Sequence, residues 1–206
     1  ARLRPLIDKH AKLSKKSTII HTPDVVPSDM KPGVALRQGR NSSMRLAINA
    51  VAEGKADAVL SAGNTGALMA MAKFVLKTLP GITRPAIASV FPTMKKGRGT
   101  VVLDLGANIE CTSRSLVEFS ILGAVYAKNI WGIKSPKVGL LNVGSEDMKG
   151  RDNIREAAEI MREDFSAGQY IDFAEGTDLN KGEADVIVAD GFTGNVALKT
   201  AEGTAK

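Results

Sequence analysis

The chain has 206 residues, of which 44% are apolar and 24% charged, as is ordinary for a globular protein with one sizeable core. Its aromatic content of 4% argues against a single-strand nucleic-acid platform, which needs stacking rings. The formal charge of +6 favours an anionic partner, and composition alone does not choose among nucleic acid, anionic lipid and an acidic protein. The longest nearly apolar run, residues 116–131, is too short for the ~20-residue span of a bilayer.

Cys111 is the single cysteine, which excludes an intramolecular disulfide framework and fits a reducing compartment. It lies between a predicted strand and a predicted helix, where a nucleophile could sit. The two histidines, His10 and His21, both lie in the basic opening region, so a Cys–His pair has little support. We therefore interpret Cys111 as a structural residue.

The first part of the chain is predicted to be mainly helical. Residues 1–16 read as a basic, partly amphipathic helix, residues 17–20 as a short strand, and residues 23–32 as a loop marked by prolines. Apolar residues then recur at helical spacing from Met44 to Val51, and Gly54 ends that helix.

Two arginines precede this second helix. Arg37 and Arg40 come shortly before Ser42 and Ser43, either of which is a natural N-cap. Arginines ahead of a serine-capped helix could hold an anion. An ordinary capped helix with solvent-facing arginines explains the pattern as well.

The stretch from Asp57 to Ala67 passes from a predicted strand at 57–60 into a predicted helix at 68–79. A helix N-terminus offers free N–H groups and a positive dipole end, and glycines let an anion approach the backbone. The spacing matches neither common nucleotide fingerprint, and a plain turn capped by Asn64 or Thr65 is an equal alternative. The candidate phosphate-binding residues are Ser61, Gly63, Asn64, Thr65 and Gly66.

Residues 86–91 and 100–105 read as two strands joined by a basic turn at 94–99, which predicts an antiparallel hairpin. Strands are also predicted at 137–143, 171–173 and 185–190, with helices between them at 116–131, capped by Ser113, and from Asp152, its predicted cap. This order favours a mixed, mainly parallel sheet.

Four predicted strand ends carry small or polar residues: Ser61, Asp104, Asn142 and Asp190. Ligands of open α/β sheets gather at the carboxyl ends of strands, so these positions are functional candidates. Lys149, near a predicted helix start, could neutralise a phosphate or a developing oxyanion, and it could equally be an ordinary surface lysine.

Several motifs together resemble the bacterial phosphate acyltransferase family of phospholipid synthesis, the acyl carrier protein to phosphate transacylases. They are Ser61–Ala67, Leu103–Asn108, Gly139–Gly144 with Lys149–Gly150, and Ala189–Asn195 with Lys199–Gly203, in the family's order. The family's opening Asp-Ala-Met-Gly-Gly-Asp element and its continuation beyond Gly203 are absent. The resemblance predicts one phosphate acyltransferase domain over residues 1–206, incomplete at both ends.

The resemblance implies a three-layer α/β/α sandwich like that of the isocitrate and isopropylmalate dehydrogenases. It also implies transfer of a fatty acyl group from acyl carrier protein to inorganic phosphate, giving acyl phosphate for phospholipid synthesis. A homodimer is expected in the cytoplasm, with peripheral membrane association through a region beyond Gly203. No metal, cofactor or nucleic acid is expected.

Phosphate is itself a nucleophile, so the reaction needs positioning and electrostatics rather than an acyl-enzyme. We expect catalytic roles for Asn64, Asn108, Asn142, Lys149 and Asn195. We expect the acidic carrier protein to bind Lys9, Lys12, Lys15, Lys16, Lys95, Lys96 and Arg98. The alternatives are a phosphate acetyl- or butyryltransferase that uses acyl-coenzyme A, and a non-catalytic anion-binding fragment.

Overall fold

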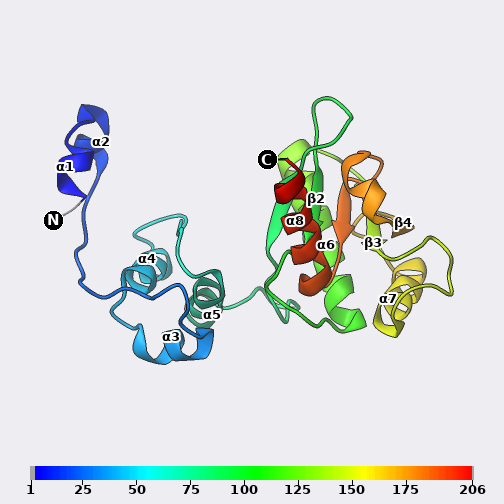
Figure 1. The fold of residues 1–206 in the computed structure, drawn as a ribbon, viewed down its shortest axis with the longest axis horizontal. Helices are drawn as coiled ribbons and strands as arrows, with labels where there is room; N and C mark the ends of the chain where they lie inside the picture. The colour runs from blue at the N-terminus through cyan, green and yellow to red at the C-terminus, as the bar shows by residue number, and fades with distance from the viewer. Residues whose placement is uncertain (1–2, 206) are drawn as a thin grey trace. The chain divides into compact units, whose positions relative to one another are not determined.

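The computed structural model describes residues 3–205, and the chain divides into two compact units, Ala1–Lys77 and Thr78–Lys206 (Figure 1). In its described residues the first unit is all-helical. Its helices are α1 (Arg4–Ile7), α2 (Ala11–Lys16), α3 (Pro32–Gln38), α4 (Ser43–Ala52) and α5 (Thr65–Leu76). The second unit contains the sheet.

Helices α3, α4 and α5 enclose the core of the first unit. Met44 and Ile48 of α4 pack with Ala67 and Met71 of α5, and Ala35 of α3 completes the cluster. The four-residue spacing of Met44 and Ile48 predicted the buried face of α4. The side chain of Ser42 caps that helix by accepting a hydrogen bond from the Arg45 N–H.

Three sequence expectations for the first unit are wrong. Within the predicted helix 1–16, the described residues form two short helices, Arg4–Ile7 and Ala11–Lys16, because the backbone is extended at His10 between them; residues 1 and 2 lie outside the described residues. The strands expected at 17–20 and 57–60 do not form. The described part of this unit offers no strand for them to pair with, and Leu60 is 98% exposed.

The second unit is built on a five-stranded sheet in the order β1-β2-β5-β3-β4. Its strands are β1 (Ala88–Phe91), β2 (Thr100–Leu103), β3 (Lys137–Leu141), β4 (Gln169–Ala174) and β5 (Val186–Val188). β1 pairs with β2 antiparallel, and every other pair is parallel. The predicted hairpin and the mixed, mainly parallel sheet are confirmed.

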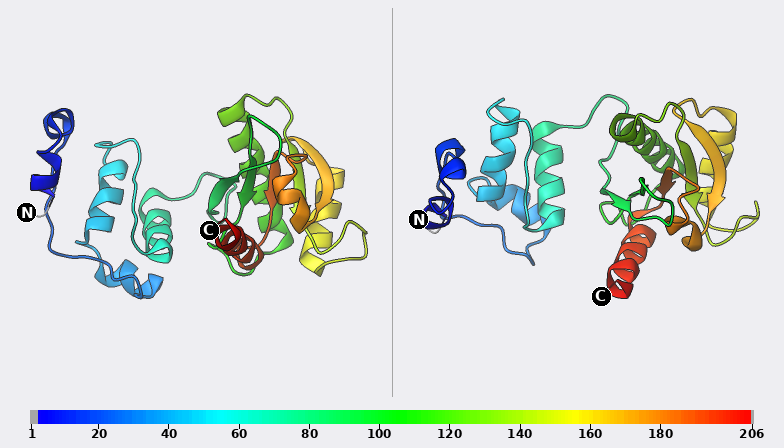
Figure 2. Two further views of the ribbon diagram at one scale, coloured as in Figure 1. Left: turned by 45° about the horizontal axis from the view of Figure 1, so that its top comes forward. Right: turned by 90° about the horizontal axis from the view of Figure 1, so that it is seen from above.

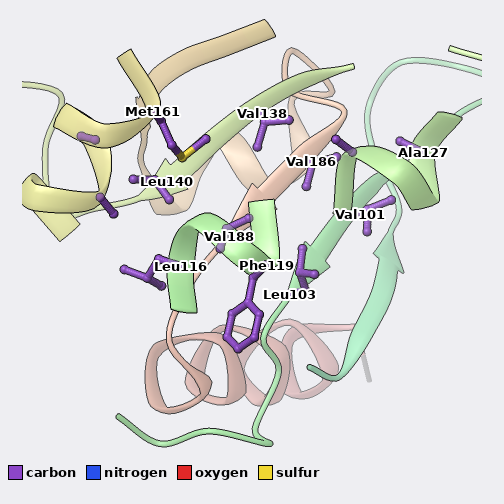
Figure 3. Packing of buried hydrophobic residues seen from close by; sticks show 13 residues of the cluster. Val101, Leu103, Leu116, Phe119, Ala127, Val138, Leu140, Met161, Val186 and Val188 are labelled. Atoms are coloured by element: carbon purple, nitrogen blue, oxygen red, sulfur yellow. The ribbon is translucent and has the colours of Figure 1, made fainter. Parts of the chain in front are cut away.

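Alternation along the central strands sends side chains to both faces of this sheet. Val101 and Leu103 face α6 (Ser113–Trp131) and α7 (Asp152–Glu163), where Phe119 is fully buried (Figure 3). Val102 faces the other way, toward a cluster that includes Leu198 of α8 (Gly191–Thr204). The short 3₁₀ helix η1 (Gly176–Asn180) contributes Leu179 to that face. The three-layer α/β/α arrangement is thus confirmed in this unit (Figure 2).

Two caps differ from expectation. Thr112, not Ser113, caps α6, because its hydroxyl accepts the Ser115 N–H at 3.2 Å. Arg151 occupies the N-cap of α7, and Asp152 is the first helical residue, where its charge favours the helix dipole. Among the described helices, none combines the length and hydropathy that crossing a bilayer requires.

Candidate functional site

The loop before α5 presents free donors to solvent. The backbone N–H groups of Thr65 and Gly66 have no acceptor in the described structure, as expected for the first residues of a helix. Both residues are exposed, and α5 has 12 residues, so its dipole places partial positive charge here. Ser61 and Gly63 of this loop line a hollow together with Ser43 at the start of α4.

Asn64 has a full set of partners within the fold. Its Oδ1 accepts the Ala67 N–H at 3.0 Å and so caps α5. Its Nδ2 lies 2.8–3.2 Å from three carbonyl oxygens of the preceding loop, those of Pro27, Ser28 and Met30. In this structure Asn64 shapes the loop, and the free donors belong to its neighbours.

Gly66 is required by packing. A Cβ at this position would lie 2.8 Å from Cγ of Pro32, and one at Gly63 would lie 3.1 Å from the terminal methyl of Met44. Gly66 therefore lets α5 approach α3, and both glycines leave the backbone open to an anion.

Asp104, directly after β2, is a fully buried acidic residue of the second unit. Its carboxylate is 0% exposed and accepts the backbone N–H groups of Ile87, Gly106, Ala107 and Asn108 at 2.7–3.2 Å. Asn108 Nδ2 adds a hydrogen bond at 2.9 Å and also donates to the Pro85 carbonyl. This carboxylate holds the turn after β2 in one conformation.

The start of α8 fits closely against that turn. A Cβ on Gly194 would lie 1.9 Å from the Asp104 carbonyl oxygen, and one on Gly191 would lie 2.6 Å from that of Asn108. Asn195 Nδ2 donates to the Leu105 carbonyl at 3.1 Å. The glycines of the Gly-Phe-Thr-Gly-Asn sequence are therefore needed for close approach of two backbones.

Asp190 joins the end of β5 to the start of α7. One carboxylate oxygen caps α8 by accepting the Thr193 N–H at 2.7 Å, and the other pairs with Arg151 at 2.9 Å. Asp190 is 3% exposed, whereas the Arg151 side chain is 61% exposed and keeps further N–H groups toward solvent. Sequence reasoning missed Arg151. A signal in the sequence could have found it: Arg151 directly precedes a predicted helix, where the helix dipole disfavours a positive charge unless a carboxylate lies nearby.

Asn142, at the end of β3, donates from Nδ2 to the Lys149 carbonyl at 3.1 Å. Its Oδ1 is buried and has no partner in the described structure. Lys149 is exposed, and its Nζ lies 3.6 Å from Glu146. Lys149 therefore retains donors for a ligand, and Asn142 presents an unused acceptor.

Cys111 follows the Asp104 turn and is half-buried. Burial raises the pKa of its thiol to about 11. A neutral thiol is a poor nucleophile, which agrees with the interpretation of Cys111 as structural.

The basic residues fall in two groups. Lys9, Lys12, Lys15 and Lys16 are exposed on or beside α1 and α2, which bury no side chain. Lys95, Lys96 and Arg98 are exposed on the β1–β2 loop and line a hollow with Asp185.

The sheet order explains which predicted residues meet. β2, β5 and β3 are adjacent and parallel, so their carboxyl ends share one edge. Asn108, Asn142 and Asn195 follow these three ends, as predicted, and Lys149 lies in the loop after β3. Residues 61–66 belong to the first unit.

A family described as "Fatty acid synthesis protein" matches residues 1–206. The chain belongs to this family. It is 61% identical over 205 residues to a phosphate acyltransferase of Rhodospirillum centenum, covering 100% of this chain and 57% of that protein. The phosphate acyltransferase of Paramagnetospirillum magneticum is 53% identical over 206 residues, covering 100% of this chain and 58% of that protein. The chain thus spans little more than half the length of these relatives.

Solved structures with a similar fold are phosphotransacetylases. That of Streptococcus pyogenes has a TM-score of 0.70 at 21% identity, covering 98% of this chain and 71% of that chain. The EutD phosphotransacetylase of Staphylococcus aureus has a TM-score of 0.65 at 20% identity, and the match covers 99% of this chain and 72% of that chain. These similarities establish a shared α/β fold.

Proposed function

We propose that the full-length protein transfers a fatty acyl group from acyl carrier protein to inorganic phosphate, giving acyl phosphate for phospholipid synthesis. The observation that carries this proposal is the 61% identity, over the whole chain, to a phosphate acyltransferase. Because the chain covers 57% of that relative, the proposal concerns the whole protein.

In the proposed reaction a phosphate oxygen attacks the thioester carbonyl carbon and forms a C–O bond. The C–S bond then breaks, and the carrier leaves as a thiolate that takes up a proton. Phosphate binds the free N–H groups of Thr65 and Gly66, with Ser61 and Gly63 beside it. The geometry of Asn64 supports a loop-shaping role at this site.

The donors for the tetrahedral oxyanion come from the shared edge of the sheet. Lys149 is the strongest candidate, because its ammonium group is exposed and held only by a 3.6 Å ion pair. Asn108, Asn142 and Asn195 use their Nδ2 atoms on backbone carbonyls, so we assign them positioning roles in this step.

The proposed macromolecular partners are acyl carrier protein and a second copy of the chain. The candidate contacts of the acidic carrier are Lys9, Lys12, Lys15 and Lys16 in the first unit and, separately, Lys95, Lys96 and Arg98 in the second. Dimerisation is supported by the apolar side chains that α6 exposes: Ile121, Val125, Tyr126 and Ile130. We place the protein in the cytoplasm, with peripheral membrane association through a region beyond Gly203.

The rival function is acyl transfer from coenzyme A to phosphate. It is favoured by the fold shared with phosphotransacetylases. Parallel assays with carrier-protein and coenzyme A thioesters separate the two, since a preference of more than about tenfold for one thioester decides between them.

The experiment that tests the proposal measures acyl phosphate, identified by its mass, from a carrier-protein thioester and phosphate. We expect the Thr65 hydroxyl to donate to the same phosphate as the Thr65 and Gly66 N–H groups, so Thr65→Val, which removes that hydroxyl, should raise the phosphate KM about tenfold. Thr200→Val, on the exposed side of α8, is the matched control and leaves KM unchanged. Phosphate-independent thioester loss would contradict the proposal.

A further inference from the structure

The first unit contains a hollow of about 430 Å³ that the proposed reaction does not use. Three of the six residues that line it are arginines. The lining residues are Leu36, Arg37, Arg40, Arg45, Asn49 and Phe74. None of these residues also lines the hollow beside the loop at 61–66, which uses Ser43, Met44 and Ala47 of α4 instead. The two hollows therefore lie against different sides of α4.

One of the three arginines is already held in place. Arg45 is partly buried, and its Nε donates to Asn49 Oδ1 at 3.1 Å. Its guanidinium carbon lies 5.4 Å from the centroid of the Phe74 ring. With Nε engaged, the two terminal nitrogens of Arg45 are left to donate to a ligand.

The other two arginines lack a partner among residues 3–205. Arg37 and Arg40 are exposed, and in the described structure neither makes an ion pair or a side-chain hydrogen bond. No acidic residue lines the hollow, and the first turn of α4, which carries Arg45, contains none. A cation at this end of a helix opposes the dipole, and its neighbours repel it. A bound anion would relieve both costs.

We propose that this hollow binds the phosphoryl group of a phosphate ester. A planar guanidinium group can donate two parallel N–H hydrogen bonds to phosphate oxygens. The three positive charges of the arginines would attract the two negative charges of a phosphate monoester. Phe74, 54% exposed, supplies an apolar wall for the organic part of the ester. A concave site lined by arginines suits a small phosphate ester, whereas the exposed lysines of α2 suit a broad acidic surface. This inference goes beyond the proposed function and does not depend on it.

The test is calorimetric titration of the chain with phenyl phosphate, and separately with inorganic phosphate and sulfate. We expect phenyl phosphate to bind at least about fivefold more tightly than inorganic phosphate, and its binding to weaken with added salt. Arg40→Gln and Arg45→Gln should each raise the Kd for phenyl phosphate about tenfold or more. Arg45→Lys keeps the charge and should lie between the wild type and Arg45→Gln.

Lys31→Gln is the matched control, because Lys31 is an exposed cation outside the hollow, and its Kd should stay within about twofold of the wild type. Arg40 is exposed, so Arg40→Gln is expected to fold, as a circular-dichroism melt can verify. The proposal is overturned if the arginine variants bind phenyl phosphate like the wild type, or if the inorganic-phosphate binding that Arg40→Gln and Arg45→Gln abolish is as tight as the binding of phenyl phosphate; inorganic phosphate that still binds these variants is counted as bound elsewhere. The readout is binding alone, so it stands or falls separately from acyl transfer.

Discussion

Glu118 is a buried carboxylate outside the candidate site that ties α6 to the segment before β1. It is 5% exposed and accepts hydrogen bonds from the backbone and the hydroxyl of Thr83, at 2.8 and 2.7 Å, and from Arg114 at 3.1 Å. Burial raises its pKa, but these hydrogen bonds outweigh burial and hold the pKa below its usual value. The ionised form is therefore the one that stabilises the fold.

Glu118→Gln is expected to lower the free energy of unfolding at pH 7 by about 2 kcal/mol, the typical worth of hydrogen bonds to a charged group. Because the folded pKa is depressed, this stabilisation is present above the unfolded pKa and is lost as the pH falls through the folded pKa. Urea titrations from pH 7 to pH 3 should show the difference between wild type and variant shrinking at the acid end. Exposed Glu110→Gln serves as control. A pH-independent difference would contradict this account.

Cys111 gives a second test at the residue scale. Its raised pKa, about 11, predicts alkylation by iodoacetamide near pH 8 about 100-fold slower than that of the unfolded chain in urea. The rate should rise with pH up to about 11. Mass spectrometry of timed samples measures this rate. Rapid labelling of the folded chain at pH 7 would instead reveal an activated thiolate and reopen the case for a nucleophile.

At the scale of elements, the contact between α8 and the Asp104 turn is the most constrained feature of the second unit. Gly194→Ala would place a Cβ 1.9 Å from a backbone oxygen, so α8 would have to move and the Asn195 hydrogen bond to Leu105 would be lost. We expect a loss of about 3 kcal/mol or more in the free energy of unfolding.

The same helix offers a matched control for this prediction. Gly203 has nothing within 4 Å of its Cβ position, and Gly203→Ala should raise stability by up to about 1 kcal/mol. Thermal denaturation of the two variants measures the contrast. If Gly194→Ala were as stable as Gly203→Ala, the close approach of α8 to the Asp104 turn would be disproved.

Periodicity predicted the elements that pack in both units. The continuous apolar runs around Val102 and Ile187, and the helical spacing of Met44 and Ile48, are hydrophobic patterns that can be read locally in the sequence. The same reasoning failed at residues 57–60, because an apolar run becomes a strand only when another strand satisfies its backbone groups. A local pattern does not reveal that partner.

The candidate site was predictable at its strand ends but not in its details. Parallel strands place Asn108, Asn142 and Asn195 at one edge, which sequence order suggests. The ion pair of Arg151 with Asp190 spans 39 positions, and Asn64 reaches carbonyls 34 to 37 residues earlier. Such long-range partners depend on tertiary packing, which no local motif records.

At the scale of the whole molecule, the two units carry different parts of the proposed chemistry. The free N–H groups of Thr65 and Gly66 belong to the first, and Lys149 belongs to the second. The central claim is that phosphate attacks the thioester directly, without an acyl-enzyme.

The most direct test is a single-turnover experiment in phosphate-free buffer, with the protein in excess over the acyl-carrier-protein thioester. The Rhodospirillum centenum relative serves as a full-length comparison. The account predicts no burst of free carrier thiol and no acyl adduct in the intact mass of the protein until phosphate is added, when acyl phosphate and free carrier appear together. A stoichiometric burst without phosphate, with the acyl mass on the protein, would contradict it.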